Sequence, residues 1–147
     1  MAREFIAPGQ IYTGEGALDM AEGKLGTLGK KALIVTDKVM VELGNAAKVE
    51  TVLKNQNIEY VIYSEINGEP TDTMIEGGLN LYKEEGCDFI VALGGGSPID
   101  SMKAIGALVT SGGQISDYMG KIITEATPTL VAIPTTAGTG SEATQFT

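Results

Sequence analysis

Two glycine-rich segments contain the residues best suited to chemistry. Glycines let a backbone approach an anion closely, and the free N–H groups and dipole at a helix N-terminus stabilise negative charge. In the first segment, an apolar run leads into three glycines and a serine, and a helical pattern follows from Pro98; the four residues are Gly94, Gly95, Gly96 and Ser97. This arrangement predicts a phosphate-binding turn, with a plain tight connection as the alternative.

Three polar side chains beside these turns have two possible roles each. Ser97 can donate to a phosphate oxygen, and it can also cap the helix, because Asp100 lies three residues further on as in a capping box. For Asp100, capping and ligand contact stay equal alternatives. Asp37 comes directly after the apolar run 31–36, at the end of the first expected strand. A carboxylate there could accept hydrogen bonds from both ribose hydroxyls and repel a 2′-phosphate. Capping the next helix is the equal alternative, and the usual glycine turn after the first strand is missing.

The second glycine-rich segment, 134–141, follows the apolar run 129–133. Ligands of open α/β sheets gather at the carboxyl ends of the strands, so this segment should lie on the same rim as the first. Its spacing of Gly138, Gly140 and Ala143 matches a dinucleotide fingerprint only formally, because the acid expected about 20 residues later lies beyond the last residue. The hydroxyls that could wrap a ligand belong to Thr135, Thr136, Thr139 and Ser141.

The elements that would position these residues alternate regularly. Apolar runs without polar alternation are typical of parallel strands covered on both faces, and four are present: 31–36, 59–63, 89–93 and 129–133. Amphipathic periodicity predicts helices between them, at 40–53, 71–85 and 98–111. We therefore expect one α/β domain with a doubly wound, mostly parallel sheet. A strand pair over 4–13 and a short helix over 16–25 should precede it.

Composition limits the possible partners and location. The 147 residues carry a net charge of −9, which argues against nucleic acid or an anionic membrane as a partner. The sequence has no apolar run of about 18 residues and no signal-peptide pattern, so we expect a cytoplasmic, soluble protein. The single cysteine, Cys87, excludes an internal disulfide. Without a histidine to activate it, Cys87 is expected to be a small buried thiol.

The two glycine-rich segments closely resemble the paired signatures of iron-containing (group III) alcohol dehydrogenases, over 94–105 and 132–142. The resemblance extends from 14–18 through 34–38 to the last residue. It implies that 1–147 is the amino-terminal, dinucleotide-binding domain, Rossmann-like and similar to the amino-terminal domain of dehydroquinate synthase. Glycerol dehydrogenases and dehydroquinate synthase-like enzymes share this domain and form a weaker alternative, against which the segment 135–142 argues.

The resemblance also implies roles for the candidate residues. Asp37 would bind the ribose and select NAD over NADP, and Asp100 would lie near the nicotinamide. Where many relatives have an asparagine that touches the nucleotide, this chain has Glu69, whose extra carboxylate could weaken binding. The pyrophosphate would lie on the first turn, at Gly94, Gly95, Gly96 and Ser97. The adenosine side would lie on the second turn, at Thr135, Thr136, Thr139 and Ser141.

In the resembled family one aspartate and three histidines of a following helical domain hold iron or zinc. This chain has no histidine, so we expect it to be truncated before that domain, to bind NAD but no metal, and to carry no catalytic residue. The complete enzyme would interconvert a small alcohol and its aldehyde or ketone, and would form a homodimer through the amino-terminal strands. The alternative is a free-standing module for nucleotide binding or dimerisation, without catalysis.

Overall fold

Four parallel strands form one sheet in the computed structural model, which describes residues 7–144. The order across the sheet is β2-β1-β3-β4, so β1 and β3 are the inner strands. The predicted apolar runs are confirmed, each within one residue of its end. The bounds are β1 (Lys31–Val35), β2 (Glu59–Tyr63), β3 (Phe89–Gly94) and β4 (Thr129–Pro134).

The register places aliphatic side chains next to one another across the sheet. Ile34 on β1 is level with Ile62 on β2 and with Val91 on β3. All six residues of β3 are buried, and four of the five in β1 are, because helices cover both faces of these inner strands. The edge strands β2 and β4 have no fully buried residue, which fits their position beside a single neighbour.

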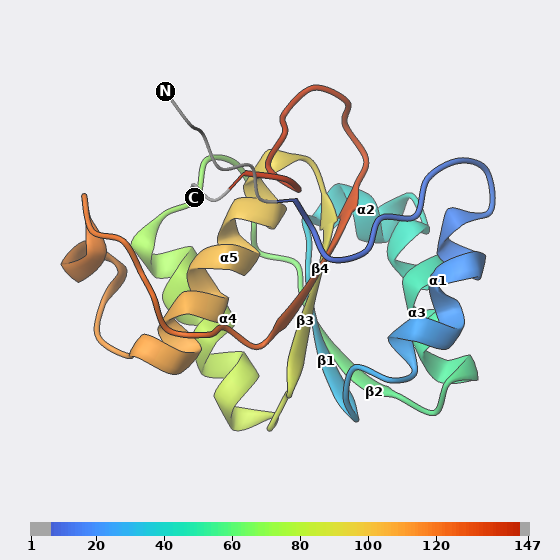
Figure 1. The fold of residues 1–147 in the computed structure, drawn as a ribbon, viewed down its shortest axis with the longest axis horizontal. Helices are drawn as coiled ribbons and strands as arrows, with labels where there is room; N and C mark the ends of the chain where they lie inside the picture. The colour runs from blue at the N-terminus through green and yellow to red at the C-terminus, as the bar shows by residue number, and fades with distance from the viewer. Residues whose placement is uncertain (1–6, 145–147) are drawn as a thin grey trace.

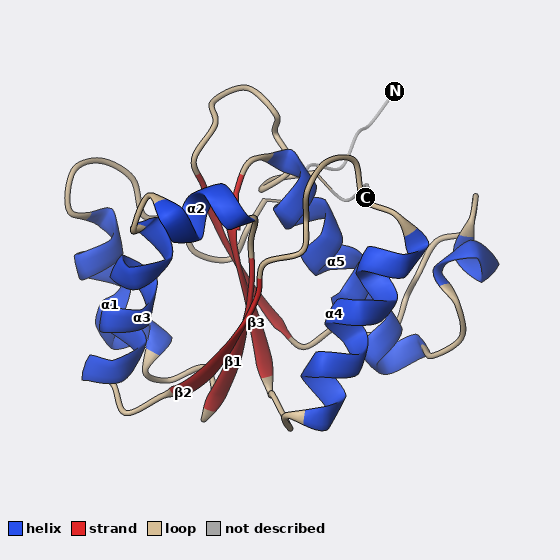
Figure 2. Ribbon diagram, turned by 180° about the vertical axis from the view of Figure 1, so that it is seen from behind, coloured by secondary structure: helices blue, strands red, loops and turns tan. Residues whose placement is uncertain are grey.

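Helices cover both faces of the sheet, as Figures 1 and 2 show, and the predicted doubly wound α/β architecture is confirmed. On one face lie α4 (Asp72–Glu84) and α5 (Gly96–Ser111), whose apolar side chains pack on Leu33, Ile90 and Ala92. On the other lie α1 (Ala17–Leu25) and α3 (Asn45–Asn55), which pack on Ile34, Phe89 and Val91. No helix within 7–144 is long and apolar enough to cross a membrane.

The single helix expected over 40–53 is wrong: the segment forms α2 (Lys38–Glu42) and α3, with a break at Leu43 and Gly44. Gly44 has φ 75°, in the left-handed region that glycine enters without steric strain, and it redirects the chain between the two helices. Leu43, which the periodicity assigned to the buried face, is 67% exposed. The helix expected over 71–85 is confirmed, and Thr71 caps it by accepting a hydrogen bond from the N–H of Met74.

The amino-terminal strand pair expected over 4–13 is not formed by residues 7–13, the part of this segment that the structure describes. Residues 4–6 lie outside the description, and 7–13 contain no strand. Pro8 lacks a backbone N–H, and two short strands without a sheet to join are only marginally stable. The short helix after this segment is confirmed as α1, beginning after Gly16. A 3₁₀ turn over Ile115–Tyr118, which was not expected, follows α5.

Candidate functional site

The carboxyl ends of β1, β3 and β4 meet at one rim of the sheet, and both glycine-rich turns begin there. The N–H of Thr135 donates to the carbonyl of Gly94 at 2.9 Å, so the second turn starts beside the first. In Figure 1 the loop after β4 rises above the sheet next to the start of α5. The sequence prediction that the two turns share a rim is therefore confirmed.

Thr36 fixes the spacing of this rim, and the sequence analysis did not identify it. Its side chain is fully buried, and its hydroxyl donates to the carbonyl of Leu93 at 2.7 Å. This bond links the end of β1 to Leu93, near the end of β3. It places Asp37 next to Gly94. A threonine at the end of an apolar run is the available sequence signal, but β-branched residues are common in strands for other reasons.

The first turn begins at Gly94, whose φ is 146°. α5 starts at Gly96, two residues before the predicted start at Pro98, and its N-cap is Gly95. The expected cap by Ser97, with Asp100 as the second half of a capping box, is therefore wrong. The glycines adopt the required turn themselves, and Ser97 lies inside the first helical turn.

The N-terminus of α5 has a free anion-binding geometry. No side-chain cap is present among the described residues, so its first N–H groups and the helix dipole are directed toward the rim. Each glycine also leaves a space that a side chain would fill. A Cβ on Gly94 would lie 3.3 Å from Asp37 Oδ2, and one on Gly95 would lie 3.3 Å from Thr136 Oγ1. One on Gly96 would lie 3.2 Å from Ser141 Oγ. The turn is thus a glycine cradle bordered by polar oxygens.

Asp37 uses its two oxygens differently. Oδ1 accepts a hydrogen bond from the N–H of Met40 at 2.9 Å, so the capping role, one of the two alternatives, is confirmed. Oδ2 faces the cradle at Gly94. The side chain is half-buried, and the second oxygen lies on the rim beside the first turn. Capping therefore engages Oδ1, and Oδ2 remains directed toward the first turn.

The threonine-rich turn places its hydroxyls around the cradle. Thr135, Thr136 and Thr139 are exposed, whereas Ser141 is only 7% exposed. Left-handed backbone at Gly138 and Gly140 curls the segment back toward α5. This curl brings Ser141 beside Gly96 and leaves the threonine hydroxyls available to a ligand.

A polar network ties this turn to α5. Ser141 Oγ donates to Asp100 Oδ2 at 3.2 Å. Lys103 Nζ lies 3.3 Å from Asp100 Oδ1 and donates to Thr144 Oγ1 at 3.1 Å. The Lys103 side chain is 16% exposed and that of Asp100 is 30% exposed, so the ion pair is partly shielded from water. Asp100 therefore links the two turns. This contact could not be predicted from the sequence of either turn.

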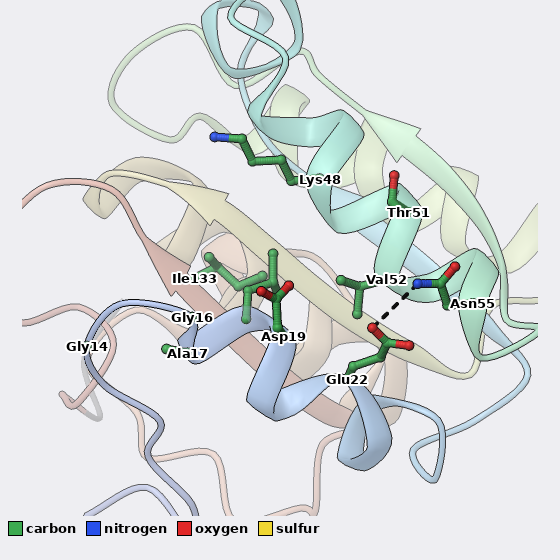
Figure 3. Close-up of a pocket in the computed structure, with 11 residues that line it drawn as sticks. Gly14, Gly16, Ala17, Asp19, Glu22, Lys48, Thr51, Val52, Asn55 and Ile133 are labelled. Carbon is green, nitrogen blue, oxygen red and sulfur yellow. Dashed lines mark hydrogen bonds between the residues drawn. The ribbon is translucent and has the colours of Figure 1, made fainter.

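Two of the cavities in the described part of the molecule bear on the site. The smaller, of about 300 Å³, is lined by both Glu69 and Asp100, so the residue that departs from the resembled family's pattern lies beside the network. The larger, of about 590 Å³, lies between α1, α3 and the end of β4. Figure 3 shows Glu22 and Asn55 hydrogen-bonded across one side of it. None of the predicted cofactor residues lines the larger cavity, so volume alone does not identify the site.

The residues described do not suit a metal centre. Within 7–144, no three histidine, cysteine, aspartate or glutamate side chains gather closely enough to hold an ion, and the whole sequence has no histidine. Cys87 is buried beside β3, as expected, and burial raises the pKa of its thiol to about 11. The thiol is therefore protonated at neutral pH and is a poor nucleophile.

Comparison with known proteins matches the fold and both turns. The family model described as iron-containing alcohol dehydrogenase matches residues 8–147. The chain is 38% identical to the NAD-dependent methanol dehydrogenase of Bacillus methanolicus, covering 99% of this chain and 39% of that protein. It is similar to the crystal structure of a 1,3-propanediol oxidoreductase, with TM-score 0.94, 37% identity, and coverage of 99% of this chain and 38% of the other.

A third similar protein was crystallised with a nucleotide. It is the sulfoacetaldehyde reductase of Bifidobacterium kashiwanohense in complex with NAD⁺, with TM-score 0.80 and 28% identity. The match covers 98% of this chain and 39% of that protein, so the chain spans well under half the length of these relatives. With the matching rim, cradle and family model together, the chain belongs to the iron-containing alcohol dehydrogenase family.

Proposed function

We propose that this chain is the NAD-binding part of a metal-dependent alcohol dehydrogenase that interconverts a small alcohol and its aldehyde or ketone. The observation that carries the proposal is the N-terminus of α5, where no described side chain forms a cap and the glycine cradle lies between the Asp37 carboxylate and the threonine-rich turn. A pyrophosphate needs backbone N–H donors without Cβ atoms in the way, and a ribose needs a nearby carboxylate. The rim offers both.

The described residues fit NAD in the following roles. The N–H groups at Gly95, Gly96 and Ser97 would hold the pyrophosphate, together with the backbone at Gly94. Asp37 Oδ2 would accept hydrogen bonds from the ribose hydroxyls. Asp100 would lie toward the nicotinamide, and the hydroxyls of the second turn would contact the adenosine side; they belong to Thr135, Thr136, Thr139 and Ser141. When bound, NAD supplies the acceptor for a hydride.

The metal does not fit this chain. Without histidine, and with no suitable cluster among residues 7–144, nothing described here would hold iron or zinc. By resemblance, the metal ligands belong to a following helical domain, which agrees with the larger size of the relatives. We therefore propose that the chain alone is catalytically incomplete.

We propose a homodimer formed through residues 1–13, and a cytoplasmic location that agrees with the single cysteine. Light scattering should give the mass of a dimer for the intact chain, and deletion of 1–13 should give a monomer or aggregate. An intact chain that is monomeric would contradict this assembly.

The test of nucleotide binding is calorimetric titration of NADH into the chain and into Gly95→Val. The added side chain would occupy the cradle beside Thr136, so affinity should fall at least about tenfold. Gly23→Ala on the exposed side of α1 is the matched control and should bind as the parent does. No heat of binding from the parent, or equal affinity for Gly95→Val, would contradict the proposed site.

A free-standing module that binds a nucleotide or dimerises without catalysis is the alternative. The reading frame after residue 147 distinguishes the two. A frame that continues into a histidine-containing helical region supports the dehydrogenase, and a stop codon supports the module.

A further inference from the structure

The loop after β2 returns to the end of β1 at the position of Asp37. The N–H of Thr36 donates to the carbonyl of Tyr63 at 2.9 Å, and this extends the pairing of β1 and β2 by one step. Asp37 and Glu65 then form an isolated antiparallel bridge. The backbone of Glu65 is thereby held beside the backbone of Asp37, although the two residues belong to different connections.

This pairing brings a second acid to the rim together with a base. Lys38, which adjoins Asp37 in sequence, has its Nζ 3.1 Å from Glu65 Oε2. The two side chains are 64% and 55% exposed, so both stay accessible to a ligand. A cation next to Asp37 is the group that a 2′-phosphate would require, and Glu65 already neutralises it.

We propose that Glu65 is a second determinant of nucleotide choice, which rejects a 2′-phosphate by keeping Lys38 in an ion pair. This inference rests on the proposed function, since it assumes that the ribose lies at Asp37. A 2′-phosphate carries about two negative charges at neutral pH. It would have to compete with the Glu65 carboxylate for the Lys38 ammonium, beside the negative charge of Asp37.

The test compares the ratio of dissociation constants for NADPH and NADH by calorimetry at low salt. Glu65→Gln should lower this ratio about threefold, the size expected of one exposed ion pair, by releasing Lys38 to the phosphate. In Lys38→Met/Glu65→Gln the ratio should return to that of Lys38→Met alone. Glu42→Gln on α2 is the matched control: it removes the same charge from an exposed position and should leave the ratio unchanged. Added salt should reduce the effect.

The outcomes separate this inference from the proposed function. If Glu42→Gln changes the ratio as much as Glu65→Gln does, the effect is one of net charge, and the role of Glu65 is overturned. It is also overturned if the gain for NADPH persists without Lys38, or if Glu65→Gln changes nothing while the parent binds NADH. If the parent binds neither nucleotide, the proposed function fails, and this inference fails with it.

Discussion

Asp37 combines a structural task with a proposed binding task in one carboxylate. Oδ1 caps α2 through the N–H of Met40, and Oδ2 faces the glycine cradle. Any substitution at this position therefore acts on the helix as well as on the ligand. Replacing a capping aspartate with glycine destabilises a helix by only a few tenths of a kcal/mol, so Asp37→Gly chiefly removes the carboxylate from the rim.

We expect Asp37→Gly to reduce the preference for NADH over NADPH by about tenfold or more. The loss corresponds to roughly 1.5–3 kcal/mol for a hydrogen bond to a charged acceptor. Titration of both nucleotides into the parent and the variant measures it. Identical titration curves for NADH and NADPH on the parent would show that Asp37 does not select the nucleotide.

Two buried hydroxyls at the sheet should respond in opposite ways when they are removed. Ser101 is fully buried, and its Oγ has no hydrogen-bond partner in the described part of the chain. Ser101→Ala should therefore raise the free energy of unfolding by about 1 kcal/mol. Thr36→Val is the matched comparison: it removes the bond to Leu93 and should lower that free energy by about 1–3 kcal/mol. Urea unfolding measures both, and a destabilised Ser101→Ala would mean that the hydroxyl has a favourable role.

Sequence reasoning found the rim residues by type but not the contacts among them. Glycines after an apolar strand and hydroxyls after the next one are local signals, so the candidate site could be proposed from them. The link between Ser141 and Asp100 joins residues 41 positions apart, and no local pattern reports it. The predicted capping box was wrong although Ser97 and Asp100 have the right spacing, because the helix begins earlier, at Gly96.

At the scale of elements, the break between α2 and α3 depends on Gly44. Its φ of 75° strains any residue with a Cβ, so Gly44→Ala should lower the free energy of unfolding by about 1 kcal/mol. Gly23→Ala is the control, because Gly23 lies within α1 without positive φ and with open space around its Cβ position. That variant should be more stable by about 0.5–1 kcal/mol. Urea melts of the two variants should shift in opposite directions, and a Gly44→Ala variant at least as stable as the parent would be inconsistent with the left-handed conformation at Gly44.

The strands could be predicted closely, whereas some helix bounds could not. An inner parallel strand must be apolar on both faces, so its sequence has few alternatives. The segment 40–53 shows the opposite case, because its apolar side chains Val41 and Leu43 are 41% and 67% exposed. Predictions from periodicity assume that apolar residues are buried. Here exposed apolar residues continued the pattern, so the sequence predicted one helix where the structure has two.

At the scale of the whole molecule, residues 7–144 form the proposed nucleotide rim but contain no cluster of side chains that could hold a metal. A metal that lowers the pKa of an alcohol needs several ligands converging on one point. Residues 7–144 contain no such group, and the sequence has no histidine. The proposed metal-dependent reaction would therefore need ligands from outside these residues, and the chain covers only 39% and 38% of two longer relatives.

We expect the purified chain to contain no stoichiometric iron or zinc and to show no alcohol oxidation. Elemental analysis after dialysis measures the metal. Absorbance of NADH in the presence of NAD, a small alcohol and added Fe²⁺ or Zn²⁺ measures turnover, with a heat-treated sample as the blank. Metal at one ion per chain, or turnover above that blank, would reveal a site among these residues.

The order of the strands also governs when the site arises during synthesis. β1 and β2 can pair as soon as both have left the ribosome, and β3 then adds to the free side of β1. The glycine cradle at the end of β3 is made before the threonine-rich turn that borders it, because that turn follows β4. A nascent chain that has not reached β4 thus holds most of the sheet without the completed rim. A nucleotide that needs both turns stabilises only the later, assembled state, so the first three strands must fold without its help.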